Sequence, residues 1–190
     1  MKLQKLISKL EKHHKKKLDL SLGRTFNLLK KLGNPQDKLK NVVTVVGTNA
    51  KASMCYSLKS ILNLAGHKTN LFTSPHLLSY TERYIFNDNE ISEEDLIELL
   101  TDVEKTLADD NATLFEILTC AFLKYAENFK DNVNIIEAGF FPQFDSTNVF
   151  KENLMTLMGV IHNDHFQWLE NKSIEGVIPV SYTHLRAHET

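Results

Sequence analysis

The sequence predicts an α/β fold in which a mostly parallel sheet of the P-loop type carries helices on both faces. The run Val42–Val46 is short, continuous and β-branched, which is typical of a strand buried on both faces. The loop Gly47–Ser53 and a helix-like stretch follow this run at once, and strand-like and helix-like segments then alternate along the chain. That order is the βαβ signature of a parallel sheet.

Each element is predicted from its apolar periodicity and from start and stop signals. The helices are expected at residues 3–10 and 22–32, from the loop to Gly66, from Ser92 onward, and at 114–129. The other strands are expected at residues 68–72, 133–137 and 154–161. Ser92 is expected to open its helix with a capping box that reaches Asp95.

Length and composition exclude several classes of protein. The 190 residues, of which 42% are hydrophobic, fit one globular domain or a piece of a larger one. No apolar run approaches the roughly 20 residues that span a bilayer, and the N-terminus lacks the pattern of a signal peptide. Cys55 and Cys120 have no disulfide or zinc spacing, so we expect two buried thiols in a cytoplasmic protein without a membrane partner.

Charge is distributed unevenly along the chain. Residues 1–40 hold 12 basic and 3 acidic side chains, a balance of +9, while residues 41–190 carry −11. The run from Lys12 to Lys17 has no interleaved aromatic side chains for base stacking. We therefore expect a solvated helix face that packs on the acidic remainder of the protein, and no nucleic-acid partner.

The loop Gly47–Ser53, with the sequence GTNAKAS, is the strongest chemical signal. Such a loop offers backbone N–H groups and a helix N-terminus to phosphate oxygens, and Lys51 adds a positive charge. The alternative is an ordinary strand-to-helix turn. Ala50 weakens the prediction, because alanine in the left-handed region costs about 1–2 kcal/mol. Ala52 is expected to be helical and harmless.

Several stretches together identify a family. They are Leu32–Gln36, Gly47–Ser53, Leu71–Leu77 with Glu82-Arg83, Phe115–Thr119, Glu137–Gly139, Asp145–Asn148, and Asp164-His165 with Trp168-Leu169. In this order and spacing they resemble the folylpolyglutamate synthase/dihydrofolate synthase family of the Mur ligase superfamily, over residues 18–168. The chain departs from the family pattern GTNGKGS at Ala50 and Ala52, and from its glycine-rich loop after Glu137.

The resemblance implies an ATP-dependent ligase with ATP and Mg²⁺ as cofactors. It would join L-glutamate to dihydropteroate or folate through an acyl phosphate, and would be a monomer at full length. By the resemblance, Gly47, Thr48, Asn49, Lys51 and Ser53 hold the triphosphate, Ser74, Glu137 and His165 bind the metal, and Asp145 lies near the acceptor substrate. Lys51 and His165 are the expected catalytic residues.

Part of the family's machinery is not found in the sequence. Members carry a carbamylated lysine some fifteen to twenty residues beyond the Asp-His pair, and Lys172 comes too soon. Residues 180–190 have no secondary-structure period and back-translate to a sequence resembling an adapter of transposase-based sequencing libraries. We therefore expect residues 1–178 to be a partial ATP-binding domain of the Mur ligase central type, residues 179–190 to be a translated adapter, and the chain alone to be inactive.

Two other functions remain open from the sequence. One is a cell-wall ligase of the Mur type, which shares the loop and the fold, and the other is a non-catalytic nucleotide-binding remnant. Glu116 is a further open point, because it lies in an otherwise apolar helix. A buried carboxylate is costly unless paired, so Glu116 is expected either to face solvent or to serve the site.

Overall fold

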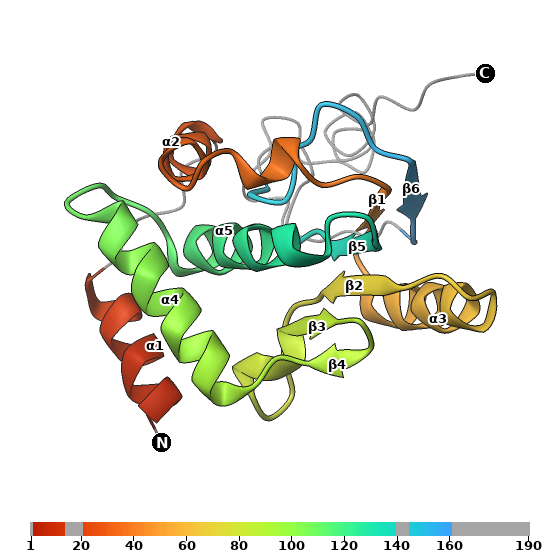
Figure 1. The fold of residues 1–190 in the computed structure, drawn as a ribbon, viewed down its shortest axis with the longest axis horizontal. Helices are drawn as coiled ribbons and strands as arrows, with labels where there is room; N and C mark the ends of the chain where they lie inside the picture. The colour runs from red at the N-terminus through yellow and green to blue at the C-terminus, as the bar shows by residue number, and fades with distance from the viewer. Residues whose placement is uncertain (1, 14–20, 140–144, 161–190) are drawn as a thin grey trace.

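A computed structural model describes residues 2–13, 21–139 and 145–160, and within them the chain forms a six-stranded sheet (Figure 1). The strands are β1 (Val42–Val46), β2 (Thr69–Phe72), β3 (Tyr84–Phe86), β4 (Asn89–Glu90), β5 (Val133–Glu137) and β6 (Met155–Met158). Their order across the sheet is β4-β3-β2-β5-β1-β6. The four strands β2, β5, β1 and β6 are parallel, and β3 and β4 add an antiparallel edge. The prediction of a mostly parallel sheet is confirmed.

The helices lie where apolar periodicity places them, within a few residues. They are α1 (Lys2–His13), α2 (Gly23–Lys31), α3 (Lys51–Leu64), α4 (Glu93–Leu107) and α5 (Leu114–Ala126), with short 3₁₀ helices η1 (Pro35–Asp37), η2 (Tyr80–Arg83) and η3 (Glu127–Phe129). The capping box predicted at Ser92 is half formed. Ser92 Oγ accepts the Asp95 N–H at 3.0 Å, and Asp95 makes no return bond within the described part of the chain.

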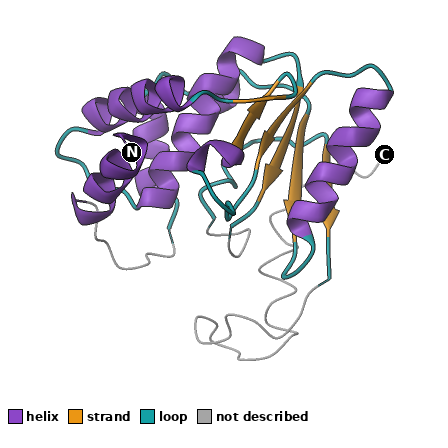
Figure 2. Ribbon diagram, turned by 90° about the horizontal axis from the view of Figure 1, so that it is seen from below, coloured by secondary structure: helices purple, strands orange, loops and turns teal. Residues whose placement is uncertain are grey.

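Helices cover both faces of the sheet, as Figure 2 shows. On one face α3 buries a small core in which Val45, Leu71 and Ile135 surround Cys55. On the other face α5, with α2, α4 and α1, covers a larger core that includes Phe72 and other aromatic side chains. Successive strand residues point to opposite faces, and both faces are covered here, so β1 and β2 are buried at every position. Cys55 and Cys120 are free and buried, as expected.

The basic N-terminal helix packs on an acidic helix. Leu3, Ile7 and Leu10 of α1 are buried on the core side, and α1 contacts α4, whose first turn is acidic. Across this contact Lys9 Nζ lies 2.9 Å from Glu104 Oε2. Part of the predicted packing of basic on acidic segments is therefore seen at this contact, while residues 14–17 of the basic run lie outside the described residues.

Glu116 does not face solvent. Its side chain is 6% exposed, and it forms a capping box with Thr113 at the N-terminus of α5. Arg24 Nε of α2 donates to both carboxylate oxygens at 3.2 Å, and Thr25 Oγ1 donates at 3.4 Å. The carboxylate thus caps the start of α5 and joins this helix to α2. The expectation that Glu116 faces solvent is wrong.

The pairing register of β2 and β5 is fixed by polar side chains. Asn70 and Asn134 are register partners, and Asn70 Nδ2 donates to Asn134 Oδ1 at 2.9 Å in the protein interior. A one-residue slip would separate these amides and break the buried hydrogen bond between them, which contributes about 0.5–1.5 kcal/mol. The same register sets Phe72 opposite Ile136, and so brings the residues that follow both strands together.

Candidate functional site

The phosphate loop begins where β1 ends, and β6 lies directly beside it. Gly47 has φ +135°, and a Cβ built on it would lie 3.0–3.1 Å from the backbone of Gly159. Thr48 N–H donates to Val160 O at 2.9 Å, and Gly159 N–H donates to Val46 O at 2.8 Å. Glycine is required at position 47 because both the backbone angle and the space exclude a side chain.

Ala50 adopts the left-handed conformation, with φ +64°, immediately before α3. Its carbonyl accepts the Met54 N–H at 3.0 Å, so it opens the helix without a side-chain cap. Ala52 lies in the first helical turn and is exposed, as predicted. The strain expected from the alanines of this loop is therefore confined to Ala50.

Ala50→Gly is expected to raise the free energy of unfolding by about 1 kcal/mol, because glycine adopts positive φ without the steric cost that alanine has. Urea denaturation measures the change. Ala52→Gly is the matched control and should lower stability by about 1 kcal/mol, because position 52 is helical. Loss of stability in Ala50→Gly would contradict the expectation.

Lys51 lies across its own loop. Its Nζ donates to Gly47 O at 2.9 Å and to Thr48 O at 3.3 Å. The first turn of α3 has neither an acidic residue nor a side-chain cap. The N-terminal end of α3 and the Lys51 ammonium therefore form a positively charged site suited to phosphate.

Ser74 and Glu137 meet at the carboxyl edge of the sheet, next to this loop. Ser74 N–H, beyond the end of β2, donates to Glu137 Oε2 at 3.0 Å, at the end of β5. Glu137 is 2% exposed, and burial raises the pKa of its carboxyl above the ordinary value. The Ser74 N–H and the nearby charges of Lys51 and Arg83 oppose that rise.

Asp145 is also buried close to Glu137, whose pKa its charge raises further. Its Oδ1 accepts Thr147 N–H at 2.9 Å and Thr147 Oγ1 at 2.6 Å. A Cβ at Gly139 would lie 3.2 Å from Asp145 Oδ2 and 2.6 Å from the ring of Phe115. Gly139 therefore allows Asp145 and α5 to approach the end of β5.

The structure brings most of the predicted site residues to one edge. Lys51, Ser74, Glu137 and Asp145 follow strands β1, β2 and β5 or lie against their ends, where ligands bind in open α/β sheets. His165, the third expected metal ligand, lies outside the described residues. Within residues 2–13, 21–139 and 145–160, no group of three or more His, Cys, Asp or Glu side chains is placed to hold a metal ion.

Sequence reasoning assigned no role to Glu82, which caps η2 and holds the turn that carries Ser74. The available signal was the S-x-x-E pattern from Ser79 to Glu82, which is a capping-box signature. Sequence reasoning also assigned no role to Gly159. A Cβ added at this glycine would lie 3.1 Å from Asn49 O. Its signal was a glycine inside the run 154–161, where a glycine often marks close approach of another backbone.

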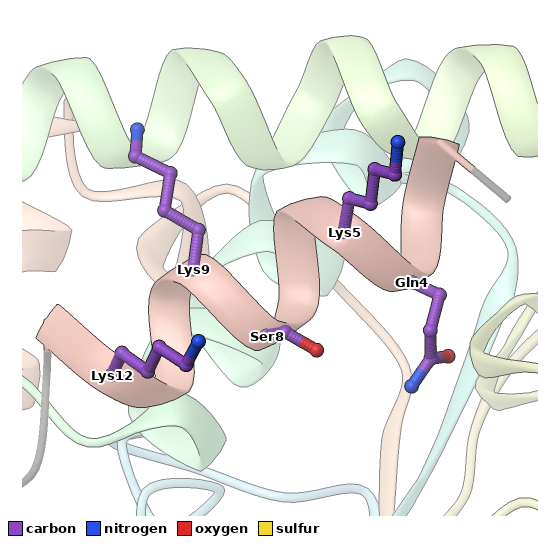
Figure 3. Close-up of a pocket in the computed structure, with 5 residues that line it drawn as sticks. All are labelled: Gln4, Lys5, Ser8, Lys9 and Lys12. Atoms are coloured by element: carbon purple, nitrogen blue, oxygen red, sulfur yellow. The ribbon is translucent and has the colours of Figure 1, made fainter.

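A basic pocket lies away from this edge, on α1 (Figure 3). Its volume is about 430 Å³, and its lining includes Gln4, Lys5, Ser8, Lys9 and Lys12. Figures 1 and 2 both place α1 and α3 at opposite ends of the molecule. Lys9 is paired with Glu104, so the pocket lies beside the α1–α4 contact. Because α1 and α3 are far apart, the pocket forms no part of the phosphate loop.

No helix among the described residues is long and apolar enough to cross a membrane.

No protein-family model matches the chain. Individual proteins do match it. The dihydrofolate synthase/folylpolyglutamate synthase of Bacillus subtilis is 38% identical over 157 residues, which are 79% of this chain and 36% of that protein. The Escherichia coli protein of the same name is 33% identical over 163 residues, or 86% of this chain and 38% of that protein.

Solved structures agree with these matches. Escherichia coli FolC in complex with DHPP and ADP superimposes with a TM-score of 0.86 at 32% identity, and the match covers 94% of this chain and 42% of that one. The bifunctional folylpolyglutamate synthase/dihydrofolate synthase of Yersinia pestis, complexed with AMPPNP and Mn ion, gives 0.88 at 29% identity, covering 98% and 45%.

The chain therefore spans well under half the length of the curated relatives it matches. The matches nevertheless cover most of the chain. By sequence and by structure, the chain belongs to the dihydrofolate synthase/folylpolyglutamate synthase family.

Proposed function

We propose that this chain is the ATP- and Mg²⁺-binding part of a ligase that joins L-glutamate to dihydropteroate or folate. The observation that carries the proposal is the meeting of Lys51 with Ser74 and Glu137 at one sheet edge, in a member of this family. Its neighbours are solved with ADP, or with AMPPNP and Mn ion. Because the chain spans 36% of the Bacillus subtilis relative, ligation is assigned to a protein of the relatives' length.

The proposed reaction activates a carboxylate before it forms an amide. The acceptor carboxylate attacks the γ-phosphorus of ATP, and ADP leaves with the electrons of the broken P–O bond. The glutamate amine then attacks the resulting acyl phosphate, loses a proton and expels phosphate. In this scheme Gly47, Thr48, Asn49 and Ser53 hold the triphosphate, Lys51 offsets its negative charge, and Asp145 lies near the acceptor.

The residues of the Ser74–Glu137 pair fit a divalent cation. Both offer oxygen ligands, which Mg²⁺ prefers, and a buried carboxylate with a raised pKa gains a compensating charge from such an ion. Bound Mg²⁺ would supply neutralisation of charge on the phosphate oxygens. His165 is proposed as a further ligand. We place the protein in the cytoplasm and expect a monomer.

Lys51→Ala is expected to weaken ATP binding about 10- to 100-fold, because charge-assisted hydrogen bonds to phosphate contribute about 1.5–3 kcal/mol. Calorimetric titration of the chain with ATP and Mg²⁺ measures this change. Lys59→Ala is a control on the same helix, where Lys59 pairs with Asp88 on the β3–β4 hairpin, and it should leave ATP affinity unchanged.

ATP affinity that survives Lys51→Ala would contradict the proposal. Salt-sensitive RNA binding without ATP binding would instead favour a nucleic-acid-binding protein. ATP binding without ligation by the protein of full length would indicate the nucleotide-binding remnant. Mass spectrometry of folate products formed by that protein with labelled glutamate detects ligation.

A further inference from the structure

The turn between β2 and η2, residues 74–79, is held by a carboxylate that lies a few residues further along the chain. Glu82 accepts the N–H groups of Leu77, Leu78 and Ser79, at 2.8, 2.8 and 2.7 Å. Three successive backbone donors on one side chain form an anion-binding concavity that the chain fills itself. These bonds lower the pKa of the Glu82 carboxyl, so it is charged at neutral pH.

Apolar packing does not hold the tip of the turn in place, although nearer its start the His76 ring lies 4.1 Å from that of Tyr80. The side chains of Leu77 and Leu78 are 91% and 94% exposed, so they contribute almost no buried area. The tip of the turn is therefore fixed by hydrogen bonds, and Glu82 supplies the acceptor for three of them. Arg83 fixes the turn nearer its start, because its Nε donates to His76 Nδ1 at 2.9 Å.

The start of the same turn carries Ser74. Its N–H donates to Glu137 at 3.0 Å, and Thr73 N–H donates to Arg83 O at 3.2 Å. We propose that Glu82 is a positioning residue, which orients Ser74 toward Glu137 by fixing residues 77–79. The proposal rests on the proposed function where it concerns metal binding, since Ser74 and Glu137 are the candidate ligands. Loss of such an outer partner typically weakens metal affinity 10- to 100-fold.

The first test measures amide hydrogen exchange by NMR in the metal-free chain. Glu82→Ala is expected to speed exchange of the Ser74 amide at least tenfold, while the amides of β5 keep their protection. Ser74 is the diagnostic amide because Glu82 does not touch it. Glu98→Gln, at an exposed acid of α4, should leave Ser74 unchanged. Wild-type protection of Ser74 in Glu82→Ala would overturn the proposal.

The second test compares metal and nucleotide binding. Mn²⁺ affinity in the presence of AMPPNP is expected to fall about tenfold in Glu82→Ala and less in Glu82→Gln, which keeps one acceptor oxygen. AMPPNP affinity without metal should not change. Equal losses in both affinities, or no loss of Mn²⁺ affinity, would overturn the positioning role. If the Ala variant fails to fold, the Gln variant serves for both tests.

The two proposals fail in distinguishable ways. A wild-type chain that binds neither Mn²⁺ nor nucleotide would remove the proposed function. In that case the exchange rate of the Ser74 amide still decides whether Glu82 orients this turn, because that measurement needs no ligand.

Discussion

Glu137→Gln is expected to abolish divalent-metal binding and, at neutral pH, to raise the free energy of unfolding of the metal-free protein. Glu137 is 2% exposed, and burial raises the pKa of its carboxyl because an ionised group is poorly solvated there. The variant keeps an oxygen that accepts the Ser74 N–H and removes the buried charge. Loss of the charge should weaken metal binding by more than the 10- to 100-fold that an outer partner costs.

The direction of the pH dependence follows from the raised pKa. The folded protein binds this proton more tightly than the unfolded chain, whose carboxyl has the ordinary value of 4.5. The contribution of Glu137 to stability is therefore complete below pH 4.5, and it is lost as pH rises through the folded-state pKa. The amide that Glu137→Gln introduces cannot ionise. The free energy of unfolding of the variant, relative to that of the wild type, should therefore rise between about pH 4 and pH 7.

Urea unfolding at both pH values, with and without Mn²⁺, measures these effects. Mn²⁺ should raise the midpoint of the wild type and leave that of Glu137→Gln unchanged, because a ligand stabilises only the state that binds it. Glu98→Gln controls for the loss of one negative charge. Equal stabilisation of wild type and Glu137→Gln by Mn²⁺ would place the metal site elsewhere.

The buried parallel strands were predictable from the sequence almost to the residue. Val42–Val46 and Val133–Glu137 are strands with the expected bounds, because both faces of the sheet are covered and most residues of each run are therefore apolar. The β3–β4 hairpin was not predicted. Its strands have three and two residues, too few for a period, and its turn depends on positive φ at Asn87 and Asp88.

The site was predictable as far as it depends on topology. Parallel strands end at one edge, so residues following β1, β2 and β5 had to lie near one another, as Lys51, Ser74 and Glu137 do. Contacts set by side-chain orientation were not predictable. Whether Glu116 faces solvent, ligand or protein depends on the angle at which α2 crosses α5, and periodicity carries no information on that angle.

Glu116→Ala is expected to lower the free energy of unfolding by about 3–5 kcal/mol, which is the usual cost of breaking a buried ion pair from one side. The substitution removes the half of the capping box that accepts Thr113 N–H, and it deprives Arg24, whose side chain is 18% exposed, of the Glu116 carboxylate. Thr113→Val removes only the other half, the hydroxyl that accepts Glu116 N–H, and should cost about 1 kcal/mol. Chemical denaturation measures each variant.

A double-mutant cycle separates the ion pair from the cap. If Arg24 and Glu116 stabilise the protein as a pair, then Arg24→Met/Glu116→Ala should lose less stability than the sum of the single variants, since the interaction between them is lost only once. Asp102→Ala is the exposed comparison. Its pair with Lys105 on α4 lies in solvent, so about 0.5 kcal/mol or less is expected. Strict additivity of Arg24 and Glu116 would mean that the two residues do not stabilise the protein as a pair.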